Sequence, residues 1–261
     1  MTGITGRRVC WLALIVLAAG SLLPAQTRLT VAVAADFAAA LREIAKQYEK
    51  RGGAHVVLVM GASGNLTTQI EQGVPYDLFF SADVGYPERL QNEGLTAAMP
   101  KVYAVGKLVL WAPKGSNIDL EKLGGKALLE APVRKIAIAN PQHAPYGRAA
   151  VAFLKKAKLY DRVLGKLVMG ENVAQAAQFA TSGNADAAIV PLALALEPEM
   201  KERGRYREIE DGLYPPIRQA AVVLKSSGKR GTAERFLEYV RSAEAAAVLA
   251  RYGFAQPEAG R

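Results

Sequence analysis

The alternation of short apolar segments with longer amphipathic ones is the feature that most restricts the fold of this chain. Residues 28–36 ("RLTVAVAAD") and 55–61 ("HVVLVMG") are apolar runs of strand length. Residues 37–51 between them carry apolar side chains at helical spacing. The same order recurs up to about residue 190. Such repetition predicts an α/β protein whose mostly parallel sheets are covered by helices on both faces.

The C-terminal part of the chain indicates how the domains are connected. After the apolar segment 215–225, two helical segments end the chain and no further strand follows. This layout favours a domain that contains both ends of the chain, with a second domain inserted between crossover strands. We therefore assign residues 26–107 and 218–261 to the first lobe and residues 108–217 to the second.

The first 25 residues have the composition of a signal peptide. Two arginines precede an apolar run from Val9 to Leu23, and small residues suited to cleavage follow it. A membrane-spanning helix usually needs about 20 residues, so a retained anchor is the second choice. The only cysteine, Cys10, lies in this run, and a mature chain without cysteine suits an oxidising compartment. We expect an exported, periplasmic protein.

The charge of the chain does not favour nucleic acid as a partner. The formal net charge is +9, from 33 basic and 24 acidic residues. The basic residues are scattered among acidic ones, and no stripe of basic and aromatic residues appears. We interpret the charge as a solvated surface.

Four turns between a predicted strand and a predicted helix are the candidate binding elements. They are "AADFA" around Asp36, "GASGN" around Ser63, "NPQHAPYG" before Tyr146, and "GENVAQ" around Asn172 and Val173. Ligands of open α/β sheets bind at such turns. Each turn offers N–H groups at a helix start and none has a basic residue at its centre, so together they favour a fully deprotonated oxyanion. Taken singly, a residue such as Ser63 or Asn172 is better explained as a cap of its own helix.

The loop at residues 140–147 is the stiffest of these turns. Pro141 and Pro145 restrict their own backbone and that of the residues before them. A helix predicted from about Tyr146 to Lys158 would therefore start with a fixed geometry and with free N–H groups.

Several segments resemble, in order, the molybdate-binding periplasmic proteins of ABC importers. They include "VAVAADFAAAL", "GASGNLTTQIEQGVPYDLFFSAD", "IANPQHAPYGRAAV", "GENVAQAAQF" and "RYGF", between Leu29 and Phe254. The resemblance implies a two-lobed periplasmic binding protein of type II, a venus flytrap that closes on molybdate or tungstate. It also implies delivery to a membrane permease with its ATPase. We expect a monomer without a cofactor and without a metal other than that of the oxyanion.

The resemblance also carries over individual roles. The serine that donates both its hydroxyl and its amide falls on Ser63, and the two backbone amides of the inserted lobe fall on Tyr146 and Val173. Their neighbours Ala35, Ala62 and Asn172 are further candidates. Two positions depart from the family pattern.

These departures are Asp36, where the family has a serine, and Pro191, where some members use a tyrosine. Pro191 has neither a phenol nor an N–H group. A carboxylate at Asp36 would repel a buried dianion unless it turned back to cap the helix starting at Phe37. If it instead faced the ligand, it would favour a protonated oxyanion. The same fold binding phosphate or sulfate is therefore the alternative function.

An enzymatic function is not predicted. The segment "GASGN" breaks the nucleophile-elbow pattern G-x-S-x-G at Asn65. The two histidines are His55, at the start of a strand, and His143, in the proline loop, where it is a candidate to line the cleft. No zinc-protease or nucleotide-binding motif is present in the sequence.

Overall fold

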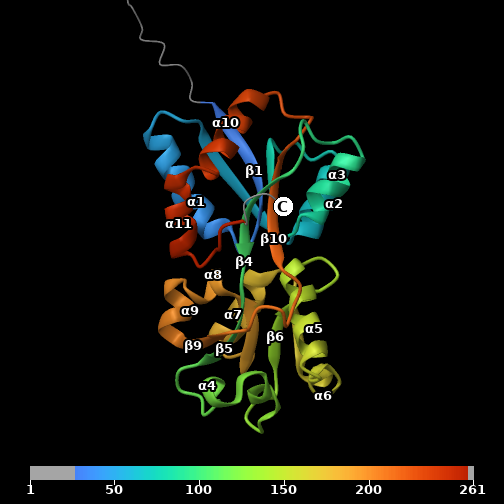
Figure 1. The fold of residues 1–261 in the computed structure, drawn as a ribbon, viewed down its shortest axis with the longest axis vertical. Helices are drawn as coiled ribbons and strands as arrows, with labels where there is room; N and C mark the ends of the chain where they lie inside the picture. Colours follow the sequence, from blue (N-terminus) through green and yellow to red (C-terminus); the bar gives the residue numbers. More distant parts are fainter. Residues whose placement is uncertain (1–26, 258–261) are drawn as a thin grey trace, which may run out of the picture.

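The computed structural model describes residues 27–257 as two lobes, each built around a five-stranded sheet (Figure 1). The predicted signal peptide, residues 1–25, lies outside the described residues, as do residue 26 and residues 258–261. Within residues 27–257, no helix has the length and apolar character needed to cross a membrane.

The first lobe contains a sheet of order β2-β1-β3-β10-β4. Its strands are β1 (Arg28–Ala34), β2 (His55–Gly61), β3 (Leu78–Ser81), β4 (Lys101–Gly106) and β10 (Ile217–Val223). Its helices are α1 (Ala38–Lys50), α2 (Ser63–Glu71), α3 (Gly85–Asn92), α10 (Arg230–Val240) and α11 (Ala243–Arg251). Helices α1, α10 and α11 lie on one side of the sheet, and α2 and α3 lie on the other (Figure 1).

Strand β1 shows why these strands read as continuous apolar runs. Val31 and Val33 pack into the cluster beneath α1, α10 and α11, whereas Ala32 packs with the residues of α2 and α3. Successive side chains of a strand point to opposite faces, so a sheet covered on both faces needs apolar residues at every position.

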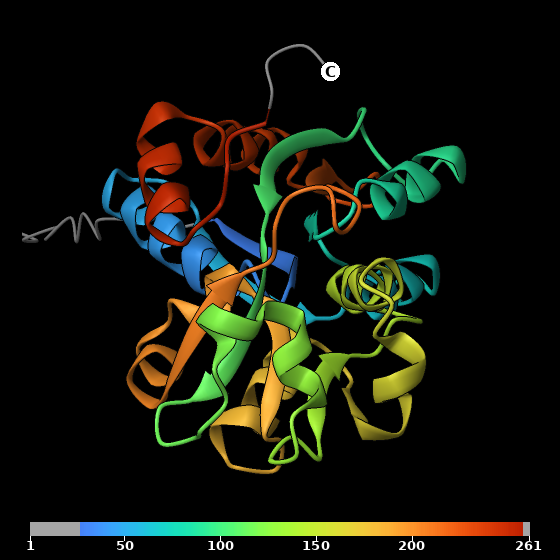
Figure 2. The same ribbon diagram turned by 60° about the horizontal axis from the view of Figure 1, so that its bottom comes forward.

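The second lobe contains a sheet of order β7-β6-β8-β5-β9. Its strands are β5 (Leu108–Pro113), β6 (Ile136–Ala139), β7 (Leu167–Gly170), β8 (Ala187–Pro191) and β9 (Gly204–Glu208). Its α-helices are α4 (Leu120–Leu123), α5 (Pro145–Lys156), α6 (Tyr160–Val163), α7 (Val173–Thr181), α8 (Leu192–Ala195) and α9 (Pro198–Arg203). Two 3-10 helices are η1 (Gly124–Leu129) and η2 (Leu164–Lys166). Figure 2 shows this lobe from below, with its sheet between helices.

The two-lobed α/β fold predicted from the sequence is confirmed, with one refinement. In each sheet one strand, β10 in the first and β5 in the second, pairs antiparallel with both neighbours. The sheets are therefore mixed, although four strands of each run in one direction. The reason is the crossover: β5 continues from β4 with only Lys107 between them, so it enters its sheet from the side of the other lobe. Strand β10 leads the chain back from the second lobe to the first, so it also enters its sheet from the side of the other lobe.

Candidate functional site

A small pocket lies between the lobes, at the carboxyl ends of several parallel strands. The pocket is partly open, and its empty space is about 200 Å³ when the solvent at its mouth is included. Its walls are formed by the turns after β1, β2, β3, β6 and β7: Ala34, Ala35, Asp36, Gly61, Ala62, Ser63, Ala82, Ala144, Pro145, Tyr146, Asn172 and Val173. All seven candidate residues from the sequence are among them. The structure thus brings together four turns that are far apart in the chain.

Helix α7 contributes the main-chain N–H group of Val173. The Oδ1 atom of Asn172, the N-cap residue, accepts hydrogen bonds from the N–H groups of Ala174 at 2.9 Å and Gln175 at 3.1 Å. Asn172 therefore uses its side chain as a cap. The N–H group of Val173, at the first position of the helix, remains free for the pocket.

Helix α5 contributes the N–H group of Tyr146. It begins at Pro145, close to the predicted start, and proline has no N–H group, so Tyr146 carries the first donor of the helix. Gly147 allows this start to lie against β6, because a Cβ atom at this position would overlap with the carbonyl group of Ala139. The proline loop therefore holds the N-terminus of α5 in one place.

Helix α2 contributes Ser63, which is 1% exposed. The Oγ atom of Ser63 accepts a hydrogen bond from the N–H group of Ala82 at 3.0 Å. Accepting this bond leaves the hydroxyl proton of Ser63 available for donation to another acceptor. Ser63 is also the first residue of α2, so its main-chain N–H group lacks a partner within the helix. Ser63 therefore offers two donors.

The turn after β1 contributes one main-chain donor. The N–H groups of Ala35 and Phe37 are bound to the carbonyl groups of Gly61 at 3.1 Å and Ala34 at 3.0 Å. Ala35 thus lines the pocket but its amide proton is occupied. The N–H group of Asp36, which also interacts with the carboxylate of its own side chain, is the remaining candidate donor of this turn.

The carboxylate of Asp36 differs from the expectation that it caps the following helix. Helix α1 begins at Ala38 with Phe37 as its N-cap residue, and no side chain caps it, because Asp36 lies one residue too early. The carboxylate instead accepts a hydrogen bond from Nε2 of Gln219 and is hydrogen-bonded to the phenol of Tyr146. Burial raises the pKa of the Asp36 carboxyl to about 6, and these hydrogen bonds lower it less than burial raises it.

The pocket differs from many anion sites in the source of the positive charge that it offers. Among the described residues that line it, none is lysine or arginine. The positive ends of the dipoles of α2, α5 and α7 meet there instead, and each offers a free N–H group. Such an arrangement can bind a species that carries only acceptor atoms.

A second set of contacts, which we call the interlobe latch, joins the lobes beside the pocket. It consists of Gly64, Asp83 and Tyr86 in the first lobe and His143 and Arg148 in the second. The carbonyl oxygen of His143 accepts hydrogen bonds from the N–H group of Gly64 at 2.9 Å and the hydroxyl of Tyr86 at 3.4 Å. Arg148 donates to Tyr86 at 3.0 Å and to Asp83 at 2.5 Å.

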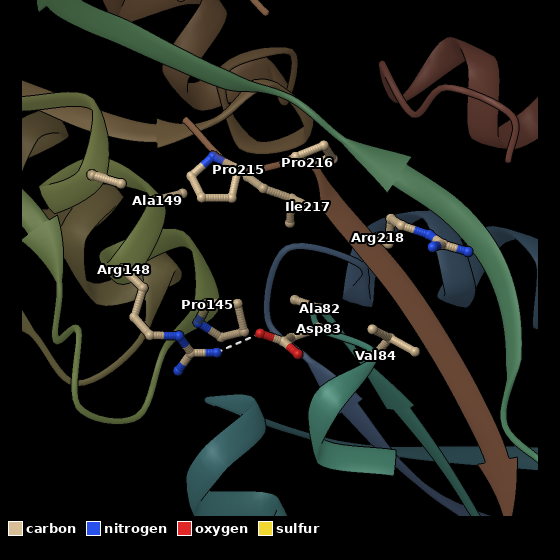
Figure 3. Close-up of a pocket in the computed structure, with 11 residues that line it drawn as sticks. Ala82, Asp83, Val84, Pro145, Arg148, Ala149, Pro215, Pro216, Ile217 and Arg218 are labelled. Atoms are coloured by element: carbon tan, nitrogen blue, oxygen red, sulfur yellow. Dashed lines mark hydrogen bonds and ion pairs between the residues drawn. The ribbon is translucent and has the colours of Figure 1, made fainter. Parts of the chain in front are cut away.

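Figure 3 shows the ion pair of Arg148 and Asp83 at the edge of a larger cavity between the lobes. Arg148 lies in the first part of α5 and binds the other lobe outside the small pocket. His143, a candidate to line the cleft, contributes its main-chain carbonyl group to the latch.

Replacing Asp83 with asparagine should have a small effect on stability. The two side chains of the pair are 42% and 31% exposed, and exposed ion pairs contribute about 0–1 kcal/mol. We expect the free energy of unfolding in urea to fall by less than about 1 kcal/mol. A loss of more than about 2 kcal/mol would show that the latch depends on this ion pair rather than on its main-chain contact.

Three other residues show where the prediction of the site from the sequence was incomplete or where a family position is not used. Gln219 and Tyr103, which contact each other beneath the pocket, were not identified from the sequence. The available sequence signal for Gln219 was a glutamine inside the strand segment "IRQAAVV". Pro191 ends β8 and is not among the described residues that line the pocket.

Comparison with known proteins finds similar sequences that match most of this chain. The profile of the family described as bacterial extracellular solute-binding protein matches residues 29–255. The molybdate-binding protein ModA of Azotobacter vinelandii is 39% identical over 225 residues, which cover 86% of this chain and 88% of that protein.

Two solved structures extend this similarity to the fold. The periplasmic molybdate-binding protein of Azotobacter vinelandii superposes with a TM-score of 0.82 at 36% identity, covering 88% of this chain and all of that chain. The substrate-binding domain assigned to a molybdenum ABC transporter of Clostridium difficile superposes with a TM-score of 0.68 at 28% identity. It covers 89% of this chain and 100% of that chain.

Proposed function

Because this chain belongs to the family of bacterial extracellular solute-binding proteins, we propose that it captures molybdate between its lobes and delivers the ion to an ABC importer. The observation that carries the proposal is the convergence of the N-termini of α2, α5 and α7 on one pocket that no basic side chain of residues 27–257 lines. Molybdate is a tetrahedral dianion with four acceptor oxygens, so it matches these donors.

We assign the contacts with the ion as follows. Ser63 donates its hydroxyl and its N–H group, and the N–H groups of Asp36, Tyr146 and Val173 complete the set. The donors come from both lobes, so only the closed arrangement surrounds the ion. Closure also removes water, which strengthens each charge-assisted hydrogen bond.

Tungstate has nearly the same size and charge as molybdate, so we expect it to bind as well. Phosphate and sulfate, the alternative ligands, are not favoured. That alternative depended on a carboxylate of Asp36 that faces the ligand, and this carboxylate is engaged by Gln219 and Tyr146. The similarity to molybdate-binding proteins points the same way.

The remaining parts of the proposal concern the setting of the protein. We propose a periplasmic, monomeric receptor that passes its ion to a membrane permease powered by a cytoplasmic ATPase. It carries no cofactor and has no catalytic function. The similarity to a periplasmic molybdate-binding protein and to a transporter domain supports this setting.

A thermal-shift panel of oxyanions tests the proposal. Micromolar molybdate and tungstate should raise the melting temperature, because a ligand that binds only the folded state stabilises it. Replacing Ser63 with alanine should weaken molybdate binding about tenfold in calorimetry, since one charge-assisted hydrogen bond is lost. The exposed Ser182, replaced in the same way, should leave binding unchanged. No shift with molybdate in the unmodified protein would contradict the proposed function.

A further inference from the structure

Four buried polar side chains form a cluster where the chain crosses between the lobes. They are Asp36 after β1, Tyr103 on β4, Tyr146 on α5 and Gln219 on β10, and each is at most 3% exposed. Buried polar groups need hydrogen-bond partners, and these four supply them to one another. The cluster therefore connects the turn after β1 with both crossover strands and with the other lobe.

Gln219 is the centre of this cluster. Its Oε1 atom accepts a hydrogen bond from the hydroxyl of Tyr103 at 2.7 Å, which orients the amide. Its Nε2 atom then donates to Oδ2 of Asp36 and, at 3.1 Å, to the phenol oxygen of Tyr146. Because the phenol of Tyr146 also contacts the Asp36 carboxylate, the three groups close a triangle.

The position of Gln219 in the sheet is also specific. It pairs with Ala104 of β4, and the register between β10 and β4 shifts directly after it, between Gln219 and Ala220. The phenol of Tyr146 fits beside it only because residue 106 is glycine, since a Cβ atom there would overlap with the phenol oxygen. The cluster is thus built around the strands that link the lobes.

A free carboxylate next to the ligand pocket would be costly. Asp36 lines that pocket, and two like charges about 4 Å apart repel each other by several kcal/mol at the low effective dielectric of a protein interior. An amide that donates to the carboxylate holds it against the crossover strands. The ligand then meets only the N–H group of this residue.

We propose that Gln219 is the positioning residue of the oxyanion site, which holds the Asp36 carboxylate away from the ion and fixes the phenol of Tyr146. This inference rests on the proposed function and deepens it. Tyr146 then has two roles, because its N–H group faces the pocket and its phenol lies in the cluster. Gln219 acts on the ion through Asp36 and touches no ligand atom itself.

The test is a double-mutant cycle with molybdate as the probe. Gln219→Met keeps the length of the side chain and removes its donors, so molybdate affinity at pH 8 should fall about tenfold or more. Adding Asp36→Asn should restore most of this loss, because no carboxylate remains to be held. Tyr103→Phe, the matched control, leaves both Nε2 donors in place and should have a smaller effect. An equal loss with and without Asp36→Asn would mean that Gln219 only packs, and would overturn the proposal.

The pH dependence separates positioning from packing. The titratable groups that face the carboxylate are the phenols of Tyr103 on β4 and Tyr146 on α5, and burial raises the pKa of both well above the usual value. Strand β10 contributes the neutral amide of Gln219, and the turn before α1 contributes the main-chain N–H groups of Asp36 and Phe37. Of these groups only the carboxylate changes charge between pH 5 and pH 8, so the loss caused by Gln219→Met should shrink at pH 5. A loss independent of pH would contradict the proposal.

A structural readout keeps this inference separate from the proposed function. If the unmodified protein bound no molybdate, the proposed function would fail, and the ligand-free crystal structure of Gln219→Met would still decide the role of Gln219. We expect the Asp36 carboxylate to turn into the pocket in this variant. An unchanged carboxylate position would overturn the proposal.

Discussion

Replacing Gly64 with alanine should lower molybdate affinity about a hundredfold while both lobes stay folded. A Cβ atom at residue 64 would lie 2.9 Å from the carbonyl oxygen and 3.0 Å from the Cα atom of His143, across the lobe boundary. It would also lie 2.8 Å from the hydroxyl of Tyr86. The main chain of His143 cannot yield without moving the proline loop. The added methyl group therefore opposes the closed arrangement of the lobes.

The added methyl group should destabilise the closed arrangement of the lobes without destabilising the first lobe itself. Overpacking costs about 1–3 kcal/mol, and the upper end of this range corresponds to about a hundredfold in affinity. The hydrogen bond from the Gly64 N–H group to His143 would be strained as well. Within α2, alanine is a better helix former than glycine by about 1 kcal/mol. The first lobe alone should thus be as stable as before, or more stable.

Gly231 provides a matched control for this substitution. It is also the second residue of a helix, α10, and a Cβ atom there would meet nothing closer than an atom of the Arg235 side chain at 3.7 Å. Gly231→Ala should leave molybdate affinity unchanged. Calorimetric titration measures the affinity of both variants, and thermal denaturation without ligand checks that they fold. If Gly64→Ala bound molybdate as tightly as the unmodified protein, the lobes would not need to meet at this contact.

The second large effect concerns the stability of the ligand-free protein. Burial raises the pKa of Asp36 from 3.8 to about 6 in the folded state. Between these values the folded protein binds more protons than the unfolded chain, so stability is lost as pH rises through this window. The full cost, present above about pH 6, is about 3 kcal/mol, because one pKa unit equals about 1.36 kcal/mol.

Asp36→Asn should remove this cost. The variant should be more stable than the unmodified protein by up to about 3 kcal/mol at pH 8, and the difference should disappear near pH 4. Urea denaturation at several pH values measures it. Asp211→Asn, at an exposed position, serves as the control and should show no such trend. A constant difference across pH 4–8 would contradict the account of Asp36 as a buried carboxylate that ionises at a cost.

The main elements of the fold and of the site were predictable because they depend on local patterns. Strand-length apolar runs and helical spacing predicted the α/β class, and the helical end of the chain together with the family resemblance predicted the two lobes. The four turns lie where strands end and helices begin, and parallel strands bring such turns to one edge of a sheet. Ser63, Tyr146 and Val173 line one pocket in the structure for this reason. Their contact with the oxyanion stays a prediction.

The contacts between distant segments were not predictable from these patterns. The carboxylate of Asp36 is hydrogen-bonded to Gln219, which is 183 residues away in the sequence, and no local signal indicates that pairing. The expected cap failed because α1 starts at Ala38, one residue too late for Asp36 to reach it as the N-cap. The latch was missed because its central acceptor is the main-chain carbonyl group of His143, and every residue has such a group.

The account rests on neutral N–H and O–H donors holding a fully charged ion. A crystal of the complex with molybdate, measured at the molybdenum absorption edge, tests this most directly. We expect one anomalous peak in the small pocket, with the ion's oxygens bonded to Ser63 and to the main-chain N–H groups of Tyr146 and Val173. A peak beside Arg148 or another basic side chain, with these donors directed elsewhere, would contradict it.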